Sequence, residues 1–129
     1  MPESSTLFDR VGGRPFFEAL THRFYQAVAA DDVLRRLYPD DPDELEAARL
    51  HLELFLAQFW GGPPDYNEAR GAPRLRLRHA RFSIGTAERD AWVEHMSEAV
   101  RAAGLQPLDE LQLLSHLSNA ATHLINQPA

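Results

Sequence analysis

Six histidines are the side chains best suited to hold a metal in this 129-residue chain, which contains no cysteine. Without cysteine, disulfides, iron–sulfur clusters and metal–thiolate sites are excluded, so a metal must be held by histidine or carboxylate. The zinc motif H-E-x-x-H is absent, and no histidine has a glutamate three residues before it, as di-iron bundles require. His116 and His123 lie about 10.5 Å apart along one expected helix, so both are interpreted as structural.

His79 differs from the other histidines in its surroundings. On a helix it shares one face with Leu75 and Phe82. Four arginines add positive charge around it: Arg74, Arg76, Arg78 and Arg81. Positive charge favours the neutral imidazole, which is the form that binds a metal. A haem group would use all three features, because imidazole binds its iron, apolar side chains contact the porphyrin, and guanidinium groups pair with its propionates.

The same segment has other interpretations. An Arg-rich surface helix or strand with Phe82 as a stacking residue is typical of an RNA-binding module without haem. The formal net charge of −6 opposes general binding to nucleic acid or anionic membranes, although it leaves this local patch open. A helical interaction domain without a cofactor is the third alternative, and it requires the pocket-facing side chains to fill one another's space.

Three aromatic side chains with polar groups are the next candidates: Tyr25, Tyr38 and Trp92. They stand in apolar contexts, where a buried hydroxyl or indole N–H needs a hydrogen-bond partner. They could donate to a bound small molecule, and ordinary core packing is the alternative.

Amphipathic helices are expected to position these residues, because apolar residues recur at three- and four-residue steps. The expected helices span 14–30, 43–60, 87–103 and 108–126. A short leading helix should end at Gly12-Gly13, and Asp- and Pro-rich residues 31–43 indicate a connecting segment. Residues 65–73 indicate a long irregular loop before a short segment at 74–82. No alternating β-branched run bounded by turns is present, so the fold is predicted to be all-α.

Composition favours a single globular domain over residues 1–129, with 44% hydrophobic and 25% charged residues. No apolar run approaches the length of a membrane span, and the first six residues lack the features of a secretory signal. We therefore expect a soluble cytoplasmic protein without membrane or nucleic-acid partners.

The motifs together resemble those of the truncated haemoglobins, specifically the second of their three main groups and most closely its actinobacterial members. They follow the family order over nearly the whole chain: Phe8-Asp9-Arg10-Val11-Gly12-Gly13, Arg23-Phe24-Tyr25, Leu34-Arg35-Arg36 through Tyr38-Pro39, Phe59-Trp60-Gly61-Gly62-Pro63, Pro73 through His79, and Arg89-Asp90-Ala91-Trp92. Each motif alone is weak, but the set is highly specific.

The resemblance implies a truncated globin fold, a two-over-two helical sandwich around haem b, with His79 as the proximal iron ligand. It implies a distal pocket that contains Tyr25, Tyr38, Ala48, Leu52 and Trp92. Further cofactor contacts are expected from Phe55, Leu56, Phe82, Arg76 and Arg78, the two arginines near the propionates or on the proximal side. The chain departs from the family at Ala72 and His51, where relatives tend to have His and Arg.

The expected function is reversible binding of O2 and other diatomic ligands such as CO and NO. Ala48 stands where many globins have a distal histidine, so hydrogen bonds to the ligand must come from Tyr25, Tyr38 and Trp92, with Tyr38 and Trp92 the first candidates. Nitric-oxide dioxygenase or weak peroxidase activity, a reductase partner and self-association stay open. Neutral Tyr and donor-only Trp are poor bases, so ligand binding ranks above dedicated peroxidase action.

Overall fold

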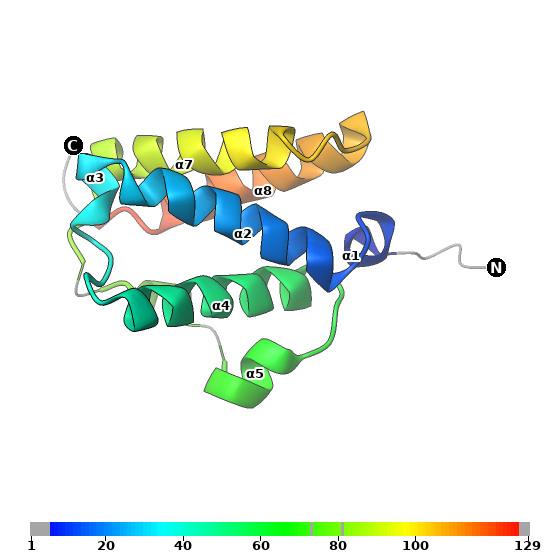
Figure 1. Ribbon diagram of the computed structural model, residues 1–129, viewed down its shortest axis with the longest axis horizontal. Helices are drawn as coiled ribbons and strands as arrows, with labels where there is room; N and C mark the ends of the chain where they lie inside the picture. The colour runs from blue at the N-terminus through cyan, green and yellow to red at the C-terminus, as the bar shows by residue number, and fades with distance from the viewer. Residues whose placement is uncertain (1–5, 73, 81, 127–129) are drawn as a thin grey trace.

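The computed structural model describes residues 6–72, 74–80 and 82–126, apart from the side chains of Arg76 and Leu77. The regular secondary structure in these ranges is α-helical, with no strand. Figure 1 shows the helices, which in chain order are α1 (Leu7–Arg10), α2 (Arg14–Ala29), α3 (Asp32–Arg35), α4 (Pro42–Phe59), α5 (Asp65–Arg70), α6 (Leu75–Arg78), α7 (Thr86–Arg101) and α8 (Pro107–His123). The predicted all-α class is confirmed, and no helix in the described ranges is long and apolar enough to cross a membrane.

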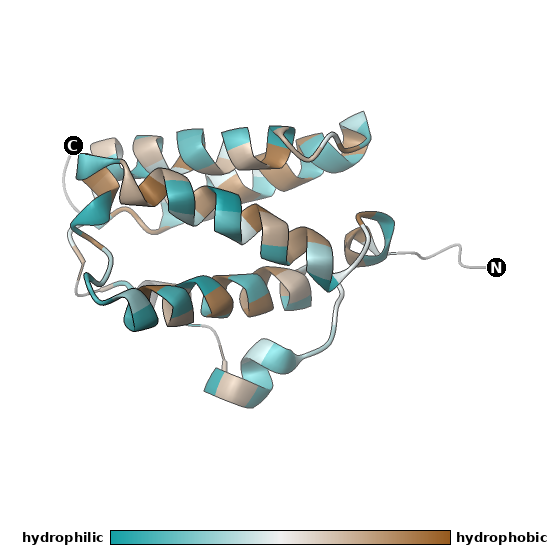
Figure 2. Ribbon diagram, viewed as in Figure 1, coloured by the Kyte–Doolittle hydropathy of each residue, from teal (hydrophilic) through white to brown (hydrophobic). Residues whose placement is uncertain are grey.

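The four long helices form two packed pairs. Helix α2 packs against α4, helix α7 packs against α8, and α2 also packs against α7. Figure 1 shows α2 between α4 and the α7–α8 pair, with the short α5 on the outer side of α4. The long helices carry hydrophobic and hydrophilic residues in alternating stretches, as their amphipathic sequences predict (Figure 2).

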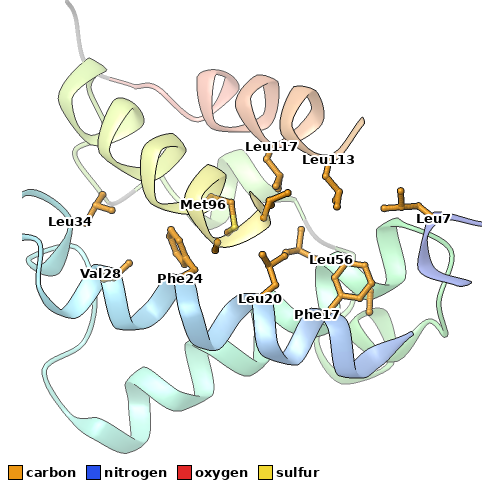
Figure 3. Close-up of a cluster of buried hydrophobic side chains, with 13 residues drawn as sticks. Leu7, Phe17, Leu20, Phe24, Val28, Leu34, Leu56, Met96, Leu113 and Leu117 are labelled. Atoms are coloured by element: carbon orange, nitrogen blue, oxygen red, sulfur yellow. The ribbon is translucent and has the colours of Figure 1, made fainter. Parts of the chain in front are cut away.

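The hydrophobic core lies where α2 faces the other long helices. Phe17, Leu20, Phe24 and Val28 form the predicted stripe on α2, and each is fully buried. They meet residues from α4, α7 and α8, including Leu56, Met96, Val100, Leu113 and Leu117 (Figure 3). This packing fixes α2 and α7, which carry Tyr25 and Trp92.

A buried ionic cluster joins α2 to α4. Arg49 and Glu53 are only 5% and 3% exposed, and their side chains form an ion pair at 2.8 Å. Arg14 from α2 also pairs with Glu53, while Arg49 donates a hydrogen bond to Thr21 Oγ1 at 2.9 Å. Buried charges are stable only when they are paired and hydrogen-bonded in this way. The cluster therefore fixes how α4 lies against α2.

The C-terminal end of α4 contacts α1. Phe8 N donates to the Trp60 carbonyl oxygen at 3.0 Å. A side chain at Gly62 would place its Cβ 2.7 Å from the Phe8 ring and 2.8 Å from the Ala57 carbonyl oxygen. Only glycine permits this close approach.

One local expectation is wrong, and another gains detail. Residues 65–70 form α5 instead of an irregular loop, because buried Tyr66 packs edge-on against Phe55 at 5.5 Å and Asn67 N donates to Gln58 Oε1 at 3.0 Å. The connecting segment after α2 contains the one-turn helix α3, whose first amide groups bond to the Asp31 carboxylate. Tertiary packing and a helix cap supply stabilisation that hydrophobic periodicity does not reveal.

Candidate functional site

A cavity of about 360 Å³ lies between the helices, within the size range of small-molecule and cofactor pockets. Every predicted site residue with a described side chain lines it: Tyr25, Tyr38, Ala48, Leu52, Phe55, Leu56, Arg78, His79, Phe82 and Trp92. Arg76 belongs to α6, but its side chain lies outside the described part of the structure, so its role stays a prediction.

His79 lies just after α6 and has a fixed ring tautomer. Its Nδ1 atom lies 2.7 Å from the carbonyl oxygen of Leu75, one helical turn before it. A carbonyl oxygen only accepts hydrogen bonds, so Nδ1 must carry a proton, and in the neutral ring Nε2 then keeps a free lone pair. This is the arrangement that a metal-binding histidine needs, with one ring nitrogen oriented by the protein and the other available as a ligand.

The other two histidines in the cavity wall differ from His79. Nδ1 of His51 lies 2.6 Å from a guanidinium nitrogen of Arg70, which always donates, so the proton of the neutral His51 ring is on Nε2. His116 stacks on Phe59 with ring centroids 4.1 Å apart. Although spacing along α8 indicated a structural role for His116, the structure places it in the cavity wall. Among these three histidines, His79 is the one whose hydrogen bond to a backbone carbonyl keeps the proton on Nδ1 and leaves Nε2 available for a metal.

Tyr25, Tyr38 and Trp92 form one aromatic group on the cavity wall. The Tyr25 and Tyr38 rings meet edge to face at 5.4 Å, and Trp92 meets the buried Phe24 ring at 5.4 Å. The interaction with the Trp92 side chain lowers the pKa of Tyr38. The indole N–H only donates, so it can act on the Tyr38 oxygen alone, which leaves the Tyr38 hydroxyl proton for another acceptor.

Both tyrosines stay protonated at neutral pH. Burial raises the pKa of Tyr38, and the hydrogen bond from Trp92 opposes this rise only in part. Burial also raises the pKa of Tyr25, with a further increase from Tyr38 and a decrease from Arg49. Each hydroxyl is therefore a hydrogen-bond donor and not a base.

Charged groups lie at the solvent-exposed edge of the cavity. Arg70 and Arg78 come from α5 and α6, and Arg78 donates to the carbonyl oxygens of Arg70 and Ala72 at 2.8 and 3.3 Å. The Arg78 guanidinium also lies 5.9 Å from the ring centroid of Tyr66. Cationic groups beside an apolar interior suit an amphipathic ligand with carboxylate ends.

Comparison with known proteins decides between the interpretations of this cavity. Residues 6–126 match the family model of the bacterial-like globins. The chain is 36% identical to the group 2 truncated haemoglobin of Bacillus subtilis over 115 residues, which cover 89% of this chain and 85% of that protein. The chain belongs to the truncated haemoglobins. Its predicted family and fold are thus confirmed, and haem b is the cofactor of the family.

Solved structures agree with this assignment. The thermostable haemoglobin of the actinobacterium Thermobifida fusca superposes with a TM-score of 0.92 at 46% identity, over 97% of this chain and all of that chain. The haemoglobin of Chloroflexus aurantiacus gives the same TM-score at 42% identity, over 96% of this chain and all of that chain. The Bacillus subtilis relative supports the predicted relation to group II, and the Thermobifida fusca structure supports the predicted relation to actinobacterial proteins.

The cavity residues of this truncated haemoglobin fit haem b. His79 presents Nε2, mostly apolar side chains form the wall, and arginines stand at the edge. The described residues contain no cluster of three His, Asp or Glu that could hold a bare metal ion. A single histidine ligand is sufficient for iron held in a porphyrin, but not for a free ion.

Sequence reasoning missed part of the cavity wall. Additional lining residues include Leu34, Leu37, Pro39, Tyr66, Arg70, Ile84, His116, Leu117, Ala121 and Leu124. The apolar stripe of α8 could have revealed Leu117, Ala121 and Leu124, which recur at steps of four and three residues. Tyr66 and Arg70 could not be found in this way, because their segment was predicted to be an irregular loop.

Proposed function

We propose that this truncated haemoglobin binds O2 and other diatomic gases reversibly, with His79 as the proximal ligand of the haem iron. The observation that carries the proposal is the His79 ring, whose Nδ1 is hydrogen-bonded to the Leu75 carbonyl oxygen while its Nε2 remains available at a cavity. Haem supplies the iron at which the gas binds. The whole chain, residues 1–129, acts as one globin domain, and a cytoplasmic location and oxygen transport belong to the same proposal.

The protein's part in ligand selection is performed by Tyr38. Trp92 interacts with Tyr38 and can only donate to its oxygen, so in the proposal the Tyr38 hydroxyl proton points to a gas molecule in the cavity. Tyr25 packs against the Tyr38 ring and limits its movement. O2 gains negative charge when it binds and so benefits from a donor more than CO does. We therefore expect slow release of O2 and a smaller effect on CO.

Ala48, Leu52, Phe55 and Leu56 line the cavity. In the proposal they exclude water from the distal side, which strengthens a hydrogen bond to the gas. No described distal donor acts as a strong base, since Tyr25 and Tyr38 remain protonated. This favours ligand binding over dedicated peroxidase action, as the sequence indicated.

The first test is the visible spectrum of the purified protein after reconstitution with haem, followed by an O2 titration of the ferrous form. The proposal predicts stoichiometric haem uptake, a Soret band and reversible O2 binding. A protein that takes up no haem and binds RNA in a salt-dependent manner would contradict it and support the Arg-rich alternative. The structure does not favour that alternative, because Arg78 and Phe82 line the cavity.

A further inference from the structure

The segment between α6 and α7 carries His79, and its described residues, 79–80 and 82–85, form neither helix nor strand. Three of these residues line the cavity: His79, Phe82 and Ile84. Helix α6, which precedes the segment, is only four residues long. A helix this short is not stable by itself, so contacts with other parts of the chain must hold His79 in place.

Asn126, in the segment after α8, provides such contacts. Its backbone N–H donates to the carbonyl oxygen of Ile84 at 2.8 Å. Its Oδ1 atom accepts from the Ile84 N–H at 2.9 Å, and its Nδ2 atom donates to the carbonyl oxygens of Phe82 and His79 at 2.8 and 3.4 Å. Figure 1 shows the chain beyond α8 returning to the start of α7. We call these four hydrogen bonds the Asn126 clamp.

The partners fix which way the Asn126 amide points. A backbone N–H only donates and a carbonyl oxygen only accepts, so Oδ1 must face the Ile84 N–H and Nδ2 must face the two carbonyl oxygens. The clamp therefore needs a side chain that donates and accepts at the same time, which neither alanine nor an ionised aspartate can do. Asn126 is exposed, so water competes for each bond, and the clamp depends on several bonds acting on one short segment.

The clamp acts on His79 through the backbone. The His79 carbonyl oxygen also accepts from the Phe82 N–H at 3.0 Å, so two donors hold it. The bond from His79 Nδ1 to the Leu75 carbonyl oxygen spans a single helical turn. It fixes the ring tautomer, but it does not fix where that turn lies in the molecule. Asn126 connects the turn to the end of α8, whose Leu117 belongs to the hydrophobic core.

We propose that Asn126 is a positioning residue that sets the orientation in which His79 meets the haem iron. The inference rests on the proposed function, in which His79 is the proximal ligand. Groups behind an axial imidazole orient it, and its orientation tunes the metal. Without the clamp the His79 backbone moves more freely, so the imidazole samples tilted orientations that weaken its bond to iron. The tautomer is unchanged, because the Leu75 contact moves with the ring.

The iron–histidine stretching band of the ferrous protein, recorded by resonance Raman spectroscopy, tests the position of His79. Asn126→Ala removes the side-chain bonds of the clamp, so the band should broaden and move to lower wavenumber. The variant should also release haem to a scavenging apoprotein about tenfold faster than wild type, equivalent to about 1.4 kcal/mol. Asn126→Asp sets an oxygen against two carbonyl oxygens, so its band should change at least as much.

Hydrogen exchange separates the acceptor of the clamp from its donor. In the diamagnetic ferrous-CO protein, the Ile84 amide should exchange roughly tenfold faster in Asn126→Ala than in wild type. Asn126→Asp should keep the wild-type protection of Ile84, because its Oδ1 still accepts. Asn119→Ala and Asn119→Asp are the matched controls at an exposed asparagine of α8 outside the cavity wall, and they should leave the band, haem release and exchange unchanged.

Detaching the imidazole from the chain shows whether the clamp acts through His79. In His79→Gly with added imidazole, the axial ligand is not attached to residue 79. Adding Asn126→Ala to this variant should leave the iron–imidazole band unchanged. An equal change in both backgrounds would show that Asn126 acts by reshaping the cavity wall at Phe82 and Ile84, and it would overturn the positioning role.

Further results would also overturn the inference. A wild-type band in both Asn126 variants would remove the role of Asn126 and leave the proposed function intact, because the band itself shows that His79 holds the iron. A change of the same size in the Asn119 variants would assign the effect to α8 as a whole. Absence of the band from wild type would overturn the proposed function as well. Circular dichroism checks that each variant folds, and either Asn126 variant alone is sufficient for the Raman test.

Discussion

Replacing Tyr38 by Phe tests how the protein controls gas release. The substitution removes one hydroxyl and keeps the ring that packs against Tyr25 at 5.4 Å. A hydrogen bond to a partly charged ligand contributes about 1.5–3 kcal/mol, so its loss should speed O2 release by roughly 10- to 150-fold. CO accepts hydrogen bonds weakly, and its release should change by less than about threefold. Stopped-flow measurement of both gases on the same preparation gives the comparison.

Two further variants test whether Trp92 affects the bound gas through Tyr38 or directly. Trp92→Phe leaves the Tyr38 hydroxyl in place but removes the donor that orients it. Its effect on O2 release should therefore be smaller than that of Tyr38→Phe. The double variant should be within about threefold of Tyr38→Phe alone, because residues that act in series are not additive. Trp60→Phe is the matched control, because the Trp60 indole N–H is buried and has no hydrogen-bond partner among the residues that the structure describes.

Three results would refute this reasoning. Release of O2 from Tyr38→Phe at the wild-type rate would show that the hydroxyl does not hold the ligand. An equal acceleration for O2 and CO would show that the substitution opened the cavity instead of removing a hydrogen bond. A fully additive double variant would show that Tyr38 and Trp92 bind the gas independently.

Three predictions concern the scaffold. Glu53→Gln removes the buried carboxylate that pairs with Arg49 and Arg14 and leaves Arg49 with Glu46 as its charge partner, so urea unfolding should show a loss of about 1.5–3 kcal/mol, and a change below about 1 kcal/mol would contradict the ion cluster's role. Gly62→Ala places a methyl group against the Phe8 ring, so its Tm should fall, and an unchanged Tm would show that the contact relaxes freely. The hydrogen bond from His95 at 2.6 Å is the main cause of the lowered pKa of Asp31. Ionised Asp31 therefore stabilises the fold above the ordinary Asp pKa of about 4, and this stabilisation disappears as pH falls through the lowered value. Asp31→Asn still caps α3, so its Tm deficit should be present at neutral pH and vanish in acid, whereas a deficit independent of pH would exclude a stabilising role for the Asp31 charge.

The helix framework was largely accessible from sequence because its signal is local. Phe17, Leu20 and Phe24 recur at helical steps, and the structure buries all three. Helix α5 was missed because its main apolar anchor is the single residue Tyr66, whose partner Phe55 lies on another helix. A short sequence window that is searched for helical periodicity does not reveal a contact between two different helices.

The candidate site was accessible for a different reason. Histidine type and spacing did not distinguish His79 from the other histidines, and the family motif selected it together with its arginine and apolar neighbours. The structure adds the Leu75 carbonyl that fixes its tautomer. It also adds the Arg70–His51 contact, which joins residues 19 positions apart through the fold. Such contacts depend on how α4 and α5 pack and have no local sequence signal.

The most direct test of the account is the spectrum of His79→Gly reconstituted with haem, recorded with and without added imidazole. The account predicts that wild type shows the ferrous spectrum of iron bound by one histidine. His79→Gly should lose this spectrum and regain it when imidazole occupies the vacated space. A His79→Gly protein with the wild-type ferrous and ferrous-CO spectra in the absence of imidazole would contradict the claim that His79 holds the iron.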